Sequence, residues 1–377
     1  MTISEDSISE IDKTGAAART YEEAVAAYAS GDIERAESLF LRSLKLLEEY
    51  EGAESPDTAV ILNDLGSIYE DRSDYIRAEH FYKKAVNITA KTACDETDHL
   101  ELRLRSLTNL GRIRRALGQY NKAELLLLQA VTIANQSFGA ESLEMAGVLN
   151  NIGMLYTHMA RFDEAESLYR RALGITEYHL GPDHPELAVI YHNLGGLERA
   201  RGRFAVGETY ARRSVEIRTR SVGSNHPDMA REIAALAMLL DGQGKYEQSE
   251  PLYRQAIEIF SLVYGAEHFE VAVNLNHLAA VREARGDYAG AEQLYRRALE
   301  IKEKLFGEMN LEVAFTINCL AALYSRQQKY DEAEWLYRRA LAIFEKALDP
   351  WHPSRLACLE NLFDMMADAN RLEVAVM

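Results

Sequence analysis

The sequence contains few cysteines, few prolines and no long apolar run. Its three cysteines, Cys94, Cys319 and Cys358, are too few and too scattered for a disulfide framework or a zinc site. A reducing compartment, the cytoplasm, is therefore expected. No apolar stretch approaches the roughly 18 residues of a membrane span, so membrane insertion is not expected. With only 7 prolines in 377 residues and 47% apolar residues, the composition excludes collagen-like and low-complexity chains.

Positive charge is also scarce. The chain has 42 Lys and Arg against 59 Asp and Glu, a net charge of −17, which argues against general binding to phosphate backbones. No nucleic-acid partner is expected. Residues 1–57 hold 14 acidic and 5 basic residues, a net of −9, so the rest of the chain carries only −8. Residues 1–16 are predicted to form an acidic flexible leader.

Catalytic signatures are missing as well. The sequence has no GxxxxGK[ST], HExxH, GxSxG or CxxC pattern. We therefore predict no catalytic residues, no metal, no cofactor and no enzymatic activity.

What the sequence does have is a repeat. Similar segments place a small residue first 45 and then, five times over, 42 residues apart, at Gly66, Gly111, Gly153, Gly195, Ala237, Ala279 and Ala321. An aromatic series keeps the same steps, at Tyr75, Tyr120, Phe162, Phe204, Tyr246, Tyr288 and Tyr330. Counting back 42 residues gives a further unit starting near Ala17, and counting forward gives a ninth helix from Pro353. The three extra residues, near 94–101, are expected in a loop.

Each unit reads as two helices joined by a polar turn. The first carries apolar residues at helical spacing, such as Val148, Leu149, Ile152 and Leu155. Unit boundaries read SPD at Ser55, HPE at His184, HPD at His226 and HPS at His352, where Pro at the first helical position loses no hydrogen bond. The pattern predicts an all-α chain.

The order of small residue, aromatic residue and Ala-x-x-x-Tyr resembles the tetratricopeptide repeat, whose usual period is 34 residues. The 42-residue period and the linkers LGPDHPELA and VGSNHPDMA resemble its kinesin-light-chain-like subclass. The resemblance implies a right-handed superhelical solenoid of about eight helical hairpins. We assign residues 17–352 to eight repeats and 353–377 to a partial repeat or capping helix.

Two further series are predicted to be structural. His184, His226, His268 and His352 stand one repeat apart, too far for one metal ion, and are expected to cap helices. The pairs Arg170–Arg171, Arg212–Arg213, Arg296–Arg297 and Arg338–Arg339 lie beside acidic residues and are expected to form i,i+4 ion pairs on the outer face. The small residues and the Tyr75 series are expected in the core.

The resemblance also implies a concave wall lined by the first helices. Read at its groove-facing positions, the wall includes Asn63, Arg105, Asn109, Arg112, Arg115, Asn150, Asn151, Asn193, Arg199 and Arg231, which we predict to bind a peptide. Asn can pair with the backbone of an extended peptide and Arg with carboxylates. In kinesin light chains, groove asparagines of a Leu-Asn-Asn motif like that at residues 149–151 contact cargo peptides, and the resemblance implies the same role for Asn150, Asn151, Asn63 and Asn109. The Asn residues could equally bridge neighbouring helices. Ala234 and Ala235 interrupt the polar series.

The sequence therefore predicts a non-enzymatic scaffold that binds an extended, acidic segment of a protein or peptide partner in the groove. The alternative is a regulatory or sensor arm that controls a catalytic partner. The oligomeric state is not predicted.

Overall fold

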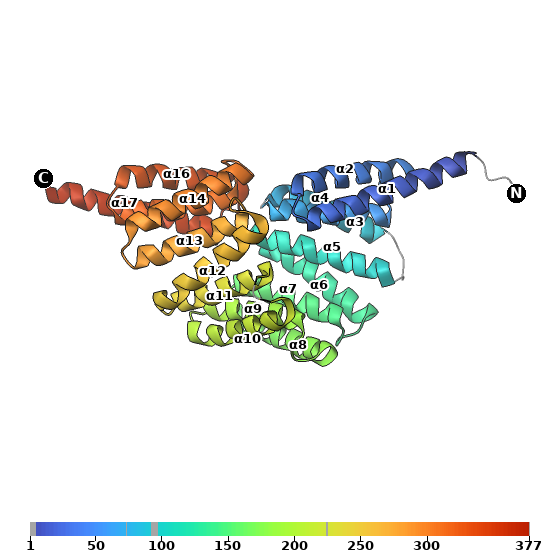
Figure 1. The fold of residues 1–377 in the computed structure, drawn as a ribbon, viewed down its shortest axis with the longest axis horizontal. Helices are drawn as coiled ribbons and strands as arrows, with labels where there is room; N and C mark the ends of the chain where they lie inside the picture. The colour runs from blue at the N-terminus through green and yellow to red at the C-terminus, as the bar shows by residue number, and fades with distance from the viewer. Residues whose placement is uncertain (1–4, 73, 92–96, 224, 377) are drawn as a thin grey trace. The chain divides into compact units, whose positions relative to one another are not determined.

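The described part of the chain consists of helices and contains no strand. The computed structural model describes residues 5–72, 74–91, 97–223 and 225–376 (Figure 1). The helices are α1 (Glu5–Ala29), α2 (Ile33–Tyr50), α3 (Pro56–Asp71), α4 (Tyr75–Lys91), α5 (Thr97–Ala116), α6 (Tyr120–Ser137), α7 (Leu143–His158), α8 (Phe162–Leu180), α9 (Pro185–Ala200), α10 (Phe204–Val222), α11 (Pro227–Asp241), α12 (Tyr246–Tyr264), α13 (Phe269–Ala284), α14 (Tyr288–Phe306), α15 (Leu311–Arg326), α16 (Tyr330–Ala347) and α17 (Pro353–Val376). In those described ranges, no helix is both long and apolar enough to cross a membrane.

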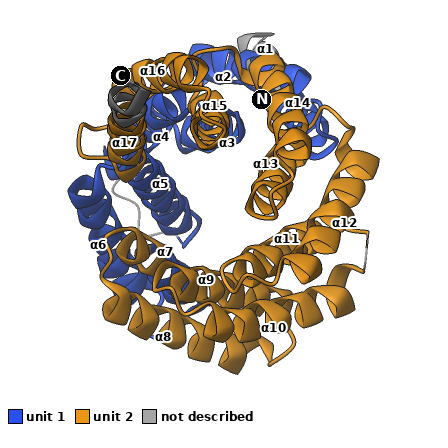
Figure 2. Cartoon of the chain, turned by 90° about the vertical axis from the view of Figure 1, so that its left-hand side faces the viewer, with its two compact units in different colours: residues 1–151 blue, residues 152–377 orange. Residues whose placement is uncertain are grey.

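Consecutive helices pair into hairpins, α1 with α2 through α15 with α16, and α17 follows α16. In the fourth hairpin, α7 and α8 meet at Gly153 and Tyr169. The expectation of eight hairpins and an all-α solenoid is confirmed. The chain divides into two compact units, residues 1–151 and 152–377, which are coloured separately in Figure 2. Within a unit the first helices of successive hairpins touch, as α3 touches α5 and α9 touches α11, so they share one wall.

Two boundaries differ from the sequence-based expectation. Helix α1 begins at Glu5, inside the stretch predicted as a flexible leader. The extra residues near 94–101 were expected in a loop, yet α5 already begins at Thr97, and residues 92–96 lie outside the described residues. Helix α17 begins at Pro353, where the ninth helix was predicted.

The histidine series caps helices, as predicted. In His184, His226 and His268 the ring Nδ1 accepts a hydrogen bond from the backbone N–H two residues on, at 3.2–3.3 Å. His352 makes the same contact with Ser354 at 3.2 Å. Each bond satisfies one of the N–H groups that the start of a helix leaves without a partner.

The core is built where the two helices of a hairpin meet. A Cβ built on Gly66 would lie 2.5 Å from Cε1 of Tyr82, and one on Gly153 would lie 2.7 Å from Cε1 of Tyr169. The small residue is therefore what lets the tyrosine of the second helix pack. The Tyr75 series, expected to fill the space between hairpins, does so only in part: Tyr75, Phe204 and Tyr246 pack against core clusters, whereas Tyr288 is 40% exposed. The tyrosines that meet the small residues are more deeply buried, namely Tyr82, Tyr169, Tyr253, Tyr295 and Tyr337.

The consecutive arginines of the second helices form ion pairs with acidic residues, as predicted. The first member of each pair contacts the glutamate four residues earlier, as in Arg170 with Glu166 at 2.8 Å and Arg338 with Glu334 at 2.7 Å. The second member of three pairs reaches an acidic residue of the preceding hairpin or linker, as Arg339 does with Glu303 at 2.7 Å. These arginines hold hairpins together on the outer face.

Candidate functional site

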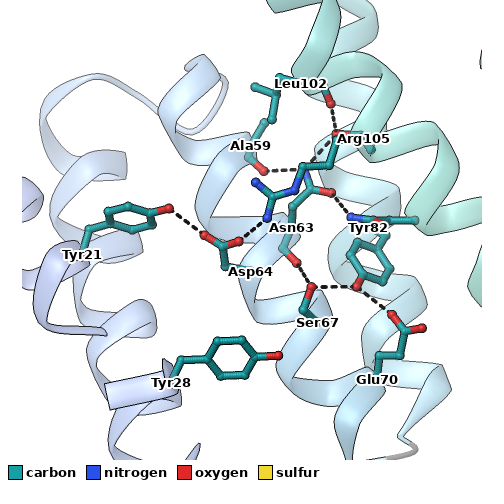
Figure 3. Close-up of polar contacts among 12 residues, drawn as sticks. Tyr21, Tyr28, Ala59, Asn63, Asp64, Ser67, Glu70, Tyr82, Leu102 and Arg105 are labelled. Atoms are coloured by element: carbon teal, nitrogen blue, oxygen red, sulfur yellow. Dashed lines mark hydrogen bonds and ion pairs between the residues drawn. The ribbon is translucent and has the colours of Figure 1, made fainter. Parts of the chain in front are cut away.

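Two of the predicted asparagines of the first unit, Asn63 and Asn109, are buried between helices. Asn63 is fully buried, and its Nδ2 donates to the Ala59 carbonyl at 2.9 Å and to Ser106 Oγ at 2.8 Å (Figure 3). Asn109, also buried, donates to Asn63 Oδ1 at 3.1 Å. These two side chains join α3 to α5 and cannot reach a peptide in this structure, so the interpretation in which Asn bridges neighbouring helices holds for both.

The predicted arginines of α5 already have carboxylate partners. Arg105 pairs with Asp64, which also accepts a hydrogen bond from Tyr21 Oη at 2.9 Å (Figure 3). Burial and the Asp64 charge raise the pKa of Tyr21 to about 12. Arg112 donates to Glu70 Oε2 at 2.6 Å. Each partner stands 41 or 42 residues earlier in the chain, one repeat away.

The other predicted residues of this unit are half-buried. Asn151 turns its Nδ2 to the Gly147 carbonyl of its own helix, at 2.9 Å. Arg115 and Asn150 are half-buried as well. None of the three lines the cavity between α1, α2 and α3 or the one across α9, α11 and α13. Most of the predicted polar side chains of unit 1 thus already have hydrogen-bond or ion-pair partners within the chain.

In the second unit, the first helices α9, α11 and α13 form most of the wall of a cavity of about 250 Å³ that is open to solvent. It is lined by His192, Gly195, Gly196, Arg199, Ala211, Arg231, Ala234, Ala235, Met238, Leu239, Phe260, Glu270, Val273, Asn274 and His277. Two of the predicted residues, Arg199 and Arg231, belong to this set, and Asn193 is half-buried on the same helix as Arg199. The Ala234–Ala235 pair, read from sequence as an interruption, gives the cavity its room because neither side chain extends beyond Cβ.

The two arginines of the cavity differ in what they contact. Arg231 is held by Asp228 at 2.8 Å and by Glu270 at 2.9 Å. Arg199 is exposed and makes no ion pair with any carboxylate in the part of the chain that the structure describes. A guanidinium without a carboxylate partner at the edge of a cavity is a binding position for an anion.

The remaining polar groups add neutral hydrogen-bonding capacity. Burial, together with the charges of Lys302 and Arg199, lowers the pKa of His277 to about 4, so its ring is neutral at pH 7. Asn274 donates to the Glu270 carbonyl at 2.8 Å, while its buried Oδ1 has no hydrogen-bond partner. His192 Nδ1 lies 3.0 Å from the buried Glu232. The cavity thus offers an apolar floor and, at its edge, a cation that has no carboxylate partner among the described residues.

Burial lowers the reactivity of the two described cysteine thiols, Cys319 and Cys358. Burial raises the pKa of the Cys319 thiol to about 11 and that of Cys358 to about 12, which keeps both protonated near neutral pH. Within the described ranges, no group of three or more His, Cys, Asp or Glu side chains is arranged to hold a metal ion.

Comparison with known proteins gives one sequence family. The family described as "Tetratricopeptide repeat" matches residues 16–91, 102–177, 144–220, 186–261, 230–304 and 312–377. No curated protein sequence matches.

Three solved structures are similar to this chain, and the two with a TM-score above 0.5 support the likeness in fold. A Rap protein complexed with competence and sporulation factor is 13% identical over 95% of this chain and 99% of its own, with a TM-score of 0.56. The apo form of RapI is 16% identical over 77% of this chain and 98% of its own, at 0.55. BtubC (BKLC) from P. vanneervenii is 21% identical over 68% and 92% respectively, at 0.44. At these low sequence identities, the similarity is evidence for the fold and not for the function.

Proposed function

The chain belongs to the tetratricopeptide repeat family, whose repeats generally mediate protein–protein interaction, and on this premise we propose that it is a non-enzymatic scaffold for an extended acidic peptide segment. The observation that carries the proposal is Arg199, a cation without a carboxylate partner in the described residues, at the cavity across α9, α11 and α13. The proposed site is therefore smaller than the one predicted from the sequence. It excludes Arg105 and Arg112, because Asp64 and Glu70 already neutralise their charges.

The cavity matches an acidic residue next to an apolar one. A peptide carboxylate would pair with Arg199. The Oδ1 of Asn274 is buried and would accept a backbone N–H only if that side chain turned toward the cavity. The apolar neighbour would pack on Met238, since Phe260 behind it is fully buried. Arg231 would contribute little, since its two carboxylate partners must first be displaced.

The proposed absence of catalysis and the proposed cytoplasmic location rest on the cysteines and on the missing signatures. Both described cysteines, Cys319 and Cys358, are free thiols. Their raised pKa values make them poor nucleophiles. Free, scattered thiols are typical of chains that work in a reducing compartment.

The test is binding of fluorescein-labelled short peptide pools that share a central Leu-Glu or Leu-Gln pair, measured by anisotropy. The Leu-Glu pool is expected to bind more tightly, and Arg199→Ala should weaken it about tenfold or more, since a hydrogen bond to a charged group is worth about 1.5–3 kcal/mol. Arg338→Ala, on the outer face, is the matched control and should bind as wild type. Equal binding of both pools, or unchanged binding by Arg199→Ala, contradicts the proposal.

A further inference from the structure

Helix α17 shows an apolar face where the other first helices are buried. Leu356, Leu359 and Phe363 stand 42 residues after Ala314, Ile317 and Ala321 of α15. The three α15 residues are completely buried. Their counterparts on α17 are 37%, 37% and 60% exposed. Spaced three and four residues apart, they lie on one face of the helix. A terminal helix that merely capped the stack would be expected to show a polar outer face.

Phe363 makes this face unsuitable for an ordinary second helix. It occupies the small-residue position, where a Cβ on Gly66 or Gly153 would already meet a tyrosine ring of the second helix at 2.5 or 2.7 Å. A phenyl group there cannot be accommodated at the usual helix spacing. A helix that packs on α17 therefore needs a recess opposite Phe363, which second helices carrying Tyr82 or Tyr169 do not provide, whereas α10 carries the smaller Ala211 at that position.

One edge of the same face is negatively charged. Glu360 and Asp364 stand four residues apart, both are exposed, and neither has an ion-pair partner in the described residues. Like charges at this spacing repel one another, so a cation placed between them is stabilising. An antiparallel second copy of α17 would bring two acidic edges together, which disfavours self-association.

We propose that the face of α17 formed by Leu356, Leu359 and Phe363, with its acidic edge, binds an amphipathic helix of a partner protein whose apolar stripe is flanked by Lys or Arg. The aliphatic and aromatic side chains would supply the buried contact. The acidic pair would select the charge of the partner and its orientation. This surface is separate from the cavity at Arg199 and does not depend on the proposed peptide.

The probe is a synthetic helical peptide with a Leu stripe flanked by Lys, compared with a twin in which Glu replaces Lys. Anisotropy with the full chain is expected to show at least tenfold tighter binding of the Lys probe. Phe363→Ala, which restores the small residue of the other repeats, should weaken that binding tenfold or more. Leu262→Ala, at a leucine of α12 that is 74% exposed, should leave it unchanged.

Charge reversal separates recognition from general attraction to an acidic protein. Glu360→Lys with Asp364→Lys should transfer the preference to the Glu probe. Glu22→Lys with Glu23→Lys, an equal charge change at exposed positions of α1, should not. Both pairs are exposed, so they keep the test valid if Phe363→Ala melts early.

Four results would overturn the proposal. These are equal binding of the two probes, wild-type binding by Phe363→Ala, equal effects of the two charge reversals, and a dimer in sedimentation that Phe363→Ala dissociates.

Discussion

Replacement of Gly153 by Leu tests the packing of a small residue against a tyrosine, which the α3–α4 and α7–α8 hairpins share. The first atom of the new side chain would lie 2.7 Å from the ring of Tyr169, which is 1% exposed and cannot move into solvent. Overpacking of this kind costs about 1–3 kcal/mol and sometimes more. Against this stands a gain of roughly 0.8 kcal/mol, because Leu favours a helix more than Gly does.

Gly147 lies in the same helix α7, is exposed and has no atom within 4 Å of a built Cβ. Gly147→Leu therefore receives the propensity gain without the clash. The two variants should differ in unfolding free energy by about 1–3 kcal/mol, which corresponds to roughly 2–4 °C in Tm per kcal/mol for a unit of this size. Thermal melting of both variants measures this difference directly.

The damage should also stay local, since each hairpin contacts only its neighbours. Hydrogen exchange of Gly153→Leu should increase around α7 to α9 and stay unchanged near α16. Adding Tyr169→Leu should recover part of the loss, because Leu127 fills the equivalent position beside Gly111. Equal melting of Gly153→Leu and Gly147→Leu would refute the reasoning.

Two more changes in stability follow from single residues. Ala160 and Gln328 have positive φ angles of 57° and 60° at turn positions where the other repeats carry Gly202 or Gly286, so replacing either by Gly should raise stability by about 0.5–1 kcal/mol in urea unfolding. The folded pKa of His277, about 4, lies below its unfolded value of 6.5, so its contribution is complete above pH 6.5 and is lost as the pH falls toward 4. Urea midpoints at pH 7 and pH 5 should therefore differ less in His277→Gln than in wild type, and an identical difference would contradict this.

Most of the fold could be predicted from the sequence because one spacing repeats. The period located both helices of each hairpin, and Pro after His or Ser marked helix starts that the structure shares at Pro56, Pro185, Pro227 and Pro353. The depth of the aromatic residues could not be predicted, because Tyr75 and Tyr82 are both tyrosines of α4, and only packing shows that Tyr82 is the one that meets the small residue.

The site was harder to predict because polar partners lie one repeat away. Asp64 and Glu70 were visible in the sequence, and their separation of 41 and 42 residues from Arg105 and Arg112 could have indicated ion pairs across layers. The cavity exists because two positions of its wall carry short side chains. Ala234 and Ala235 read as a gap in a polar series, whereas in the folded chain they create the space beside Arg199.

Side-chain contacts between neighbouring hairpins have a consequence for recombination within the repeat array. At the junction of α3 and α5, Asn63 meets Ser106 and Arg112 meets Glu70, and at the junction of α11 and α13, Arg231 meets Glu270. Asn63 is the fully buried member of these contacts. A hairpin inserted between α3 and α5 would keep its backbone geometry but would leave the Asn63 amide facing a different partner. A buried amide without a hydrogen bond costs about 1–3 kcal/mol, so recombination that separated these two hairpins would be penalised at that junction.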